Sequence, residues 1–172
     1  MQGTCNWKDC SEDRAGNSKY CWHHRAEARK NWKNSIEKKS QDRKQRYANF
    51  DRVWNKACRL AREESDKCVP TPMTVVENQD PLDDNSPLKK AWFVRSGVCG
   101  YAWLVVRPGN SSFAKWMRKN KDSRQAYHGG EHWSCPLRIQ SMEIQIAYIH
   151  EFVRVLESEL KDIKVYSMNR MD

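Results

Sequence analysis

The segment from Cys5 to His24 constrains the fold more than any other stretch, because its polar loop cannot form a hydrophobic core by itself. Its sequence is CNWKDCSEDRAGNSKYCWHH: four residues separate Cys5 from Cys10, ten separate Cys10 from Cys21, and two separate Cys21 from His24. Three thiolates and one imidazole form the soft four-donor set that tetrahedral Zn²⁺ prefers. We therefore predict one structural zinc ion that holds the ends of this loop together.

His23 is an alternative fourth ligand. If a helix begins near Tyr20, Cys21 and His24 lie one turn apart on the same helix face, whereas residues two apart diverge. We therefore favour His24 as the fourth ligand. We also favour a zinc site over the alternatives, which are a stray disulfide or four unrelated side chains. Four protein ligands leave no open coordination position for water, so we expect a structural metal and no enzymatic role for it.

The cysteine pattern favours a reducing compartment. The chain has seven cysteines, an odd number, and Cys58, Cys68, Cys99 and Cys135 are scattered. Such a pattern fits a cytoplasmic protein better than a secreted disulfide scaffold. The N-terminus lacks the basic head and apolar core of a secretory signal, and the longest uncharged stretch, residues 96–106, is too short to cross a membrane.

A long basic helix is predicted directly after the Cys/His segment. Residues 22–67 contain no Gly or Pro and are rich in Arg, Lys, Glu, Ala and Gln, which favour helix. Within residues 22–62 there are 13 Lys and Arg against 4 Asp and Glu, an excess equal to the net charge of +9 of the whole chain. A local excess of this size indicates a polyanionic partner, although a solvated helix face is the simpler alternative.

We expect this partner to be nucleic acid, DNA rather than RNA, or a host nucleoprotein complex. Contacts from a bare basic helix would go to phosphates and would carry little sequence information. The predicted phosphate-binding residues are Arg25, Arg29, Lys30, Lys33, Lys38, Lys39, Arg43, Lys44 and Arg46. Trp22 and Trp32 could stack on exposed bases, although packing is the more common use of tryptophan.

Apolar residues in the second half of the helix form a seam. They recur at steps of three and four residues, which is the spacing of one helix face. The seam consists of Tyr47, Phe50, Trp54, Ala57 and Ala61. It predicts packing on the C-terminal part of the chain, with a homodimer through residues 47–61 as the alternative.

Composition divides the chain into three parts. Residues 1–67 contain the zinc knuckle and the basic helix, residues 68–90 form an acidic, Pro-rich linker, and residues 91–172 form a small α/β module. Four prolines exclude helix across most of the linker, in which MTVV could form one short strand.

The fold class predicted for the chain is α+β, with ββαβαβ order in the module and two helices packed on a small mixed or antiparallel sheet. Residues 91–97 and 99–108 are β-rich runs joined by glycines, which indicates a hairpin or a bulged pair of strands. A short helix capped by Asn110 or Ser111 follows, then a strand interrupted at Pro136. The most regular helical stripe lies in residues 142–160 after a possible cap at Ser141, and a last strand follows.

Two resemblances bear on function. The pattern C-x4-C, polar loop, Y-C-x2-H and basic tail resembles treble-clef zinc knuckles in phage and bacterial DNA-handling proteins. The runs GYAWLVVRPGNSSFAKWMRKN and QSMEIQIAYIHEFVRVLESEL are similar to small uncharacterised proteins of tailed phages. These likenesses imply a phage-encoded, zinc-stabilised accessory protein that binds nucleic acid. The alternative is a phage inhibitor or regulator that binds a host protein, such as a defence or transcription complex.

One motif suggests chemistry of a different kind. His128, Glu131 and His132 match H-x-x-E-H, an inverted metalloprotease motif that requires a helix to place both imidazoles on one face. Two adjacent glycines within it would cost a helix about 2 kcal/mol. We therefore predict a turn entering a strand, and a metal-dependent nuclease that uses His128 or His132 remains only a third interpretation.

Overall fold

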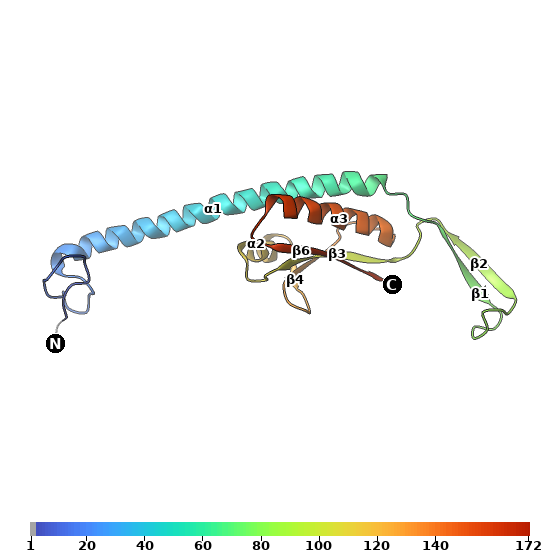
Figure 1. The fold of residues 1–172 in the computed structure, drawn as a ribbon, viewed down its shortest axis with the longest axis horizontal. Helices are drawn as coiled ribbons and strands as arrows, with labels where there is room; N and C mark the ends of the chain where they lie inside the picture. The colour runs from blue at the N-terminus through green and yellow to red at the C-terminus, as the bar shows by residue number, and fades with distance from the viewer. Residues whose placement is uncertain (1–2) are drawn as a thin grey trace. The chain divides into compact units, whose positions relative to one another are not determined.

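The computed structural model describes residues 3–172 and contains two compact units, Met1–Ala48 and Asn49–Asp172. Helix α1 (Trp22–Lys67) begins in the first unit and ends in the second (Figure 1). The boundary between the two units therefore falls within α1. None of the described helices is long and apolar enough to cross a membrane.

The first unit consists of an irregular loop and the first half of α1. The loop is held by backbone hydrogen bonds, among them Cys5 N to Glu12 O at 2.8 Å and Ala15 N to Tyr20 O at 3.0 Å. Among its described residues, only Cys5, Ala15 and Cys21 are buried. The side chains of this unit therefore provide almost no hydrophobic core.

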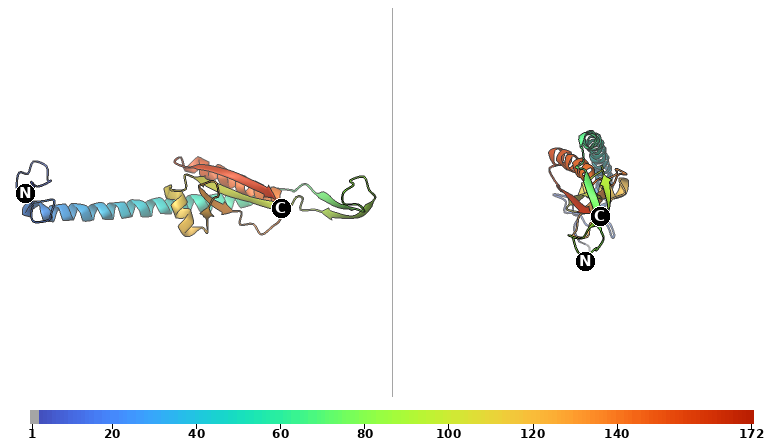
Figure 2. Two further views of the ribbon diagram at one scale, coloured as in Figure 1. Left: turned by 90° about the horizontal axis from the view of Figure 1, so that it is seen from below. Right: turned by 90° about the vertical axis from the view of Figure 1, so that its right-hand side faces the viewer.

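The second half of α1 packs on the rest of the second unit. Its buried residues are Phe50, Val53, Trp54, Ala57, Ala61 and Ser65. The Trp54 ring lies 4.7 Å from that of Trp133 and 4.8 Å from that of Phe152, centroid to centroid. The predicted packing of the seam on the C-terminal part of the chain is therefore confirmed from Phe50 onward. The second half of α1 lies beside α3 (Met142–Glu159) in both Figure 1 and Figure 2.

A four-stranded antiparallel sheet forms the centre of the second unit, with strand order β4-β5-β3-β6. Its strands are β3 (Gly100–Arg107), β4 (Arg124–Gln125), β5 (Glu131–Ser134) and β6 (Lys164–Met171). Helix α3 packs on β3 and β6, and helix α2 (Ser112–Asn120) packs near β5. The predicted α+β class, with a long N-terminal helix and small antiparallel sheets, is confirmed.

The two predicted helix caps differ in detail. Ser111 is the N-cap of α2, and its hydroxyl accepts a hydrogen bond from Ala114 N at 3.1 Å. Ser141 occupies the N-cap position of α3, but its side chain makes no capping bond, and its buried hydroxyl has no hydrogen-bond partner among the described residues. The predicted position of the second cap was therefore correct, while the capping bond was not.

A separate hairpin corrects the predicted strand pairing. Strand β2 (Leu88–Val94) does not pair with β3; it pairs with β1 (Met73–Asn78), opposite residues being Val75 and Trp92. Both edges of β3 are taken, by β5 and by β6, so no edge remains for β2. The segment 68–90, which we expected to be a linker with at most one short strand over MTVV, therefore supplies β1 and the connection into β2.

Candidate functional site

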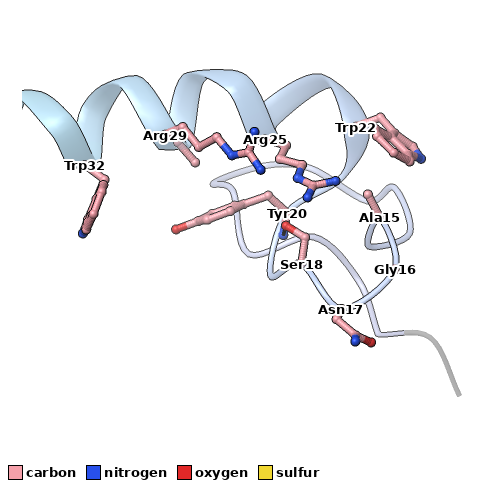
Figure 3. A pocket seen from close by; sticks show the side chains of 10 residues that line it. Ala15, Gly16, Asn17, Ser18, Tyr20, Trp22, Arg25, Arg29 and Trp32 are labelled. Carbon is pink, nitrogen blue, oxygen red and sulfur yellow. Dashed lines mark hydrogen bonds between the residues drawn. The ribbon is translucent and has the colours of Figure 1, made fainter.

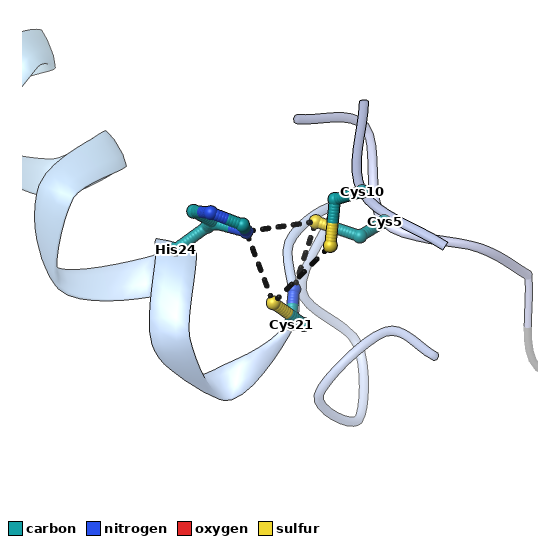
Figure 4. Close-up of side chains that lie close together, drawn as sticks. All are labelled: Cys5, Cys10, Cys21 and His24. Atoms are coloured by element: carbon teal, nitrogen blue, oxygen red, sulfur yellow. Dashed lines mark hydrogen bonds between the residues drawn. The ribbon is translucent and has the colours of Figure 1, made fainter. Parts of the chain in front are cut away.

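The four predicted metal ligands come from two adjoining pieces of the first unit. Cys5 and Cys10 lie in the N-terminal loop, where Cys10 N donates a hydrogen bond to Trp7 O at 3.2 Å and closes a turn. Asp9, the residue before Cys10, has a positive φ of 61°, which this tight reversal requires. Cys21 immediately precedes α1, and His24 lies on its first turn (Figure 4).

The structure brings these four side chains together. One ligand atom from each of Cys5, Cys10, Cys21 and His24 lies within 4.8 Å of all the others. Cys21 Sγ is 3.2 Å from His24 Nδ1, and Cys10 Sγ is 3.9 Å from Cys21 Sγ. A tetrahedral zinc site with Zn–S bonds of about 2.3 Å has sulfur–sulfur edges of about 3.8 Å, so the spacing and the donor types fit a metal ion.

His24 and not His23 joins the cluster. The imidazole of His24 stacks on the Trp7 ring, with centroids 4.9 Å apart and planes 4° from parallel. The side chain of His23 is 80% exposed and lies 3.9 Å from a Glu12 carboxylate oxygen. Trp7 was not identified as a site residue from the sequence, although an aromatic residue between the first two cysteines is a signal that could have suggested it.

The environments of two thiols differ strongly. Burial alone would raise the pKa of Cys5, but hydrogen bonds from the Cys21 and Trp7 backbone and from the His24 and Cys21 side chains lower this pKa to about 6. Burial, assisted by the neighbouring Glu12, Cys5 and Cys10 side chains, raises the pKa of Cys21 to about 11. Without a cation the Cys21 thiol therefore resists ionisation beside Cys5, and a bound metal ion would remove this resistance.

The cluster has four protein donors, and this determines its chemistry. A divalent ion held by all four would have no open position for a water or a substrate. Such a site stabilises the loop and fixes the start of α1, and it does not activate a nucleophile. An ion held by all four residues would therefore be suited to a structural role.

The predicted phosphate-binding residues lie on the first half of α1. From Trp22 to Asn49 no residue of the helix is buried. The nine cations, Arg25, Arg29, Lys30, Lys33, Lys38, Lys39, Arg43, Lys44 and Arg46, are all accessible to solvent. The helix does not gather them into one patch, because neighbours such as Lys38 and Lys39 are about 100° apart around its axis.

The H-x-x-E-H motif forms a turn and a strand, as we predicted. Gly129 and Gly130 have φ of 82° and 96°, and Glu131 and His132 belong to β5. The Glu131 side chain is fully buried, where it accepts hydrogen bonds from Ser123 Oγ at 2.7 Å and from Arg118 Nε at 3.1 Å. The carboxylate is thus occupied by an ion pair, and across residues 3–172 the Cys/His cluster is the only metal-ligating group found.

The remaining cysteines do not form a second cluster within residues 3–172. Burial raises the pKa of Cys135 to about 11, as expected for a core thiol rather than a nucleophile. Burial also raises the pKa of Cys58.

Comparison with known proteins finds no family model, no curated protein and no solved structure that matches the chain significantly. The function is therefore inferred from the Cys/His cluster and from the helix that it precedes.

Proposed function

We propose that this chain is a zinc-stabilised nucleic-acid-binding accessory protein, which contacts phosphates through the first half of α1. The observation that carries the proposal is the first part of α1, the 28 residues 22–49, which has no buried side chain and carries nine Lys or Arg against three Asp or Glu. A helical stretch with no buried side chain gains no stability from packing, so packing does not restrict which residues it contains. Its basic side chains are therefore accessible to a partner.

Zinc is the metal that best fits the cluster. Three thiolates with one imidazole at tetrahedral spacing are typical of structural Zn²⁺ sites, whereas Mg²⁺ and Ca²⁺ prefer oxygen donors. The ion would fix the loop against the first turn of α1. Its proposed role is to anchor the basic helix, not to contact the nucleic acid.

The charge pattern predicts affinity without sequence preference. None of the cations from Arg25 to Lys44 forms a salt bridge with another described residue, so their charge is available to phosphates. If six or more of them neutralise phosphates, affinity for duplex DNA should fall about 10³-fold or more between 50 and 200 mM salt. A phage origin, which the sequence resemblance implies, is part of the proposal and is not needed for this expectation.

The test is a salt titration of binding to a random-sequence DNA duplex, with the metal content of the protein measured alongside. A variant with Lys38, Lys39, Arg43 and Lys44 changed to Gln should bind more weakly and show a shallower salt slope. The matched control changes Lys115, Lys119, Arg138 and Lys161 of the second unit to Gln and should keep the wild-type slope. Binding that is absent at 50 mM salt, or independent of salt, would contradict the proposal; a host protein that stays bound after nuclease treatment would favour the inhibitor alternative.

A further inference from the structure

A pocket of about 610 Å³ lies between the first three turns of α1 and the loop that precedes them (Figure 3). Trp22 and Trp32 line it from the helix, with Arg25 and Arg29 between them in sequence, and Tyr20 lines it from the loop. We call this site the Trp–Arg pocket. In Figure 3 the Tyr20 hydroxyl points toward Trp32, and the guanidinium of Arg25 lies near Trp22.

The two tryptophans of this pocket are exposed, which packing within the unit does not explain. Trp22 is 74% exposed and Trp32 is 66% exposed, the highest values of any described tryptophan. Residues 22, 25, 29 and 32 follow one another at steps of three and four, so their side chains share one helix face. This face therefore offers two flat aromatic surfaces with two fixed cations between them.

The charge of the pocket selects an anionic partner. No acidic residue lines it, and Arg25 lies over the Trp22 ring with its guanidinium carbon 5.4 Å from the ring centroid. A second copy of the chain docked along the same face would place arginines against arginines, which is unfavourable. Aromatic surfaces beside guanidinium groups instead match the alternating bases and phosphates of a polynucleotide.

The spacing favours a strand over a single nucleotide. Trp32 follows Trp22 by ten positions along the helix, a rise of about 15 Å. Stacked bases along one strand of a duplex are about 3.4 Å apart, so one mononucleotide cannot reach both rings. Trp32 and Arg29 also line a second pocket of about 600 Å³, whose charged residues besides Arg29 are Lys30, Lys33 and Glu37. Three cations against one carboxylate continue the positive charge along the helix past Trp32.

From this geometry we propose that the Trp–Arg pocket binds single-stranded nucleic acid, with unpaired bases stacked on Trp22 and Trp32 and with phosphates held by Arg25 and Arg29. Bases within an intact duplex cannot stack on these rings, because both of their faces are covered by neighbouring bases. This inference rests on the proposed nucleic-acid-binding function and adds to it a preference for unpaired strands.

The experiment measures binding of the full-length, metal-loaded protein to a labelled 15-nucleotide oligo(dT) and to a labelled 15-base-pair duplex at low salt. Trp32→Ala should weaken oligo(dT) binding about 5- to 150-fold, the range for the loss of one base stack, and should change duplex binding less than about twofold. Tyr127→Ala is the matched aromatic control, because Tyr127 is 96% exposed and lies outside the pocket. This control should leave both affinities unchanged.

A second pair of variants separates the pocket from general charge. Arg29→Gln and Arg43→Gln remove the same charge from α1, but only Arg29 lines the pocket. Arg29→Gln should weaken oligo(dT) binding at least threefold more than Arg43→Gln, whereas the two should weaken duplex binding equally. If Arg29→Gln and Arg43→Gln weaken binding equally, both for oligo(dT) and for the duplex, the proposed role of the pocket is wrong while the phosphate-binding function stands. If the wild-type protein binds neither probe, the proposed function itself is wrong.

Discussion

At the scale of single residues, the position at which α1 begins determines which of His23 and His24 faces the three cysteines. The helix begins at Trp22, so the third residue after Cys21 returns to the side of the preceding loop. There the His24 ring stacks on the Trp7 ring, and the two planes are nearly parallel. The His23 side chain is exposed, and its Nε2 lies 3.9 Å from a Glu12 carboxylate oxygen.

The first prediction contrasts these two histidines. His24→Ala should lower metal affinity by at least about 10- to 100-fold, because even residues that only orient a ligand are worth that much. His23→Ala should leave metal affinity within about twofold of wild type, since its side chain is 80% exposed and outside the cluster. Competition with a zinc-binding dye, or the visible absorption of the Co²⁺-substituted protein, would measure both.

The opposite ranking would show that the first helical turn differs from the one described. Equal losses would mean that the two imidazoles compete for one coordination position. A double variant then distinguishes these cases, because it should bind no more weakly than His24→Ala if His23 has no role.

At the scale of elements, α1 is one helix with two different environments. Its residues up to Asn49 bury nothing, whereas Phe50, Trp54 and Ala57 are among those buried by the aromatic core of the second unit. The rings of Phe113 and Trp116 contact both Phe50 and Trp54 at centroid distances from 5.2 to 6.4 Å. Tryptophans on the same helix should therefore differ greatly in what they contribute to stability.

The second prediction measures this difference. Trp54→Ala should lower the free energy of unfolding of the second unit by about 3–5 kcal/mol, the usual cost of removing a large aromatic side chain from a core. Trp22→Ala should change the stability of that unit by less than about 0.5 kcal/mol, because 74% of Trp22 is exposed. Urea unfolding followed by far-UV circular dichroism gives both values.

A small effect of Trp54→Ala would contradict the packing of α1 on α3 and β5. Ala57 and Ala61, both fully buried on the same face, provide an independent check. A larger side chain at either position should destabilise the unit by about 1–3 kcal/mol through overpacking.

The helices and the grouping of the four candidate ligands could be predicted from the sequence because their signals are local. The stripe of α3 and the spacing from Cys5 to His24 involve residues within a few turns or one loop of each other. The pairing of strands could not be predicted, because β3 pairs with β6, more than fifty residues later in the chain, and a local pattern does not specify such a partner. Strand β2 pairs with β1 instead of β3. The stack of Trp7 on His24 was also missed, because an aromatic residue between the first two cysteines is a signal that does not specify which imidazole the ring will cover.

At the scale of the whole molecule, the two units differ in what can hold them together. The second unit has a core of large apolar side chains that includes Trp116, Tyr148, Phe113 and Phe152, all fully buried. The described part of the first unit buries Cys5, Ala15 and Cys21, and two of these three belong to the Cys/His cluster that could hold a metal ion. The stability of the first unit should therefore depend on metal, and that of the second should not.

The third prediction follows from this asymmetry. In zinc-finger peptides a structural zinc ion contributes about 10–16 kcal/mol, which the sparse core of the first unit cannot replace. A strong chelator should therefore remove amide protection in residues 3–21 and in the first turns of α1, while β3 and α3 keep theirs. Hydrogen exchange followed by mass spectrometry resolves the two regions in one experiment.

A variant with Cys5→Ser and Cys10→Ser is the matched control for the chelator. It should show the chelated exchange pattern before any chelator is added, and it should not respond further, because two of its four donors are lost. Loss of protection in β3 and α3 together with the loop would mean that the metal stabilises the aromatic core as well. The same measurement therefore decides whether the basic helix is anchored by a separate metal-dependent unit, as the proposed function requires.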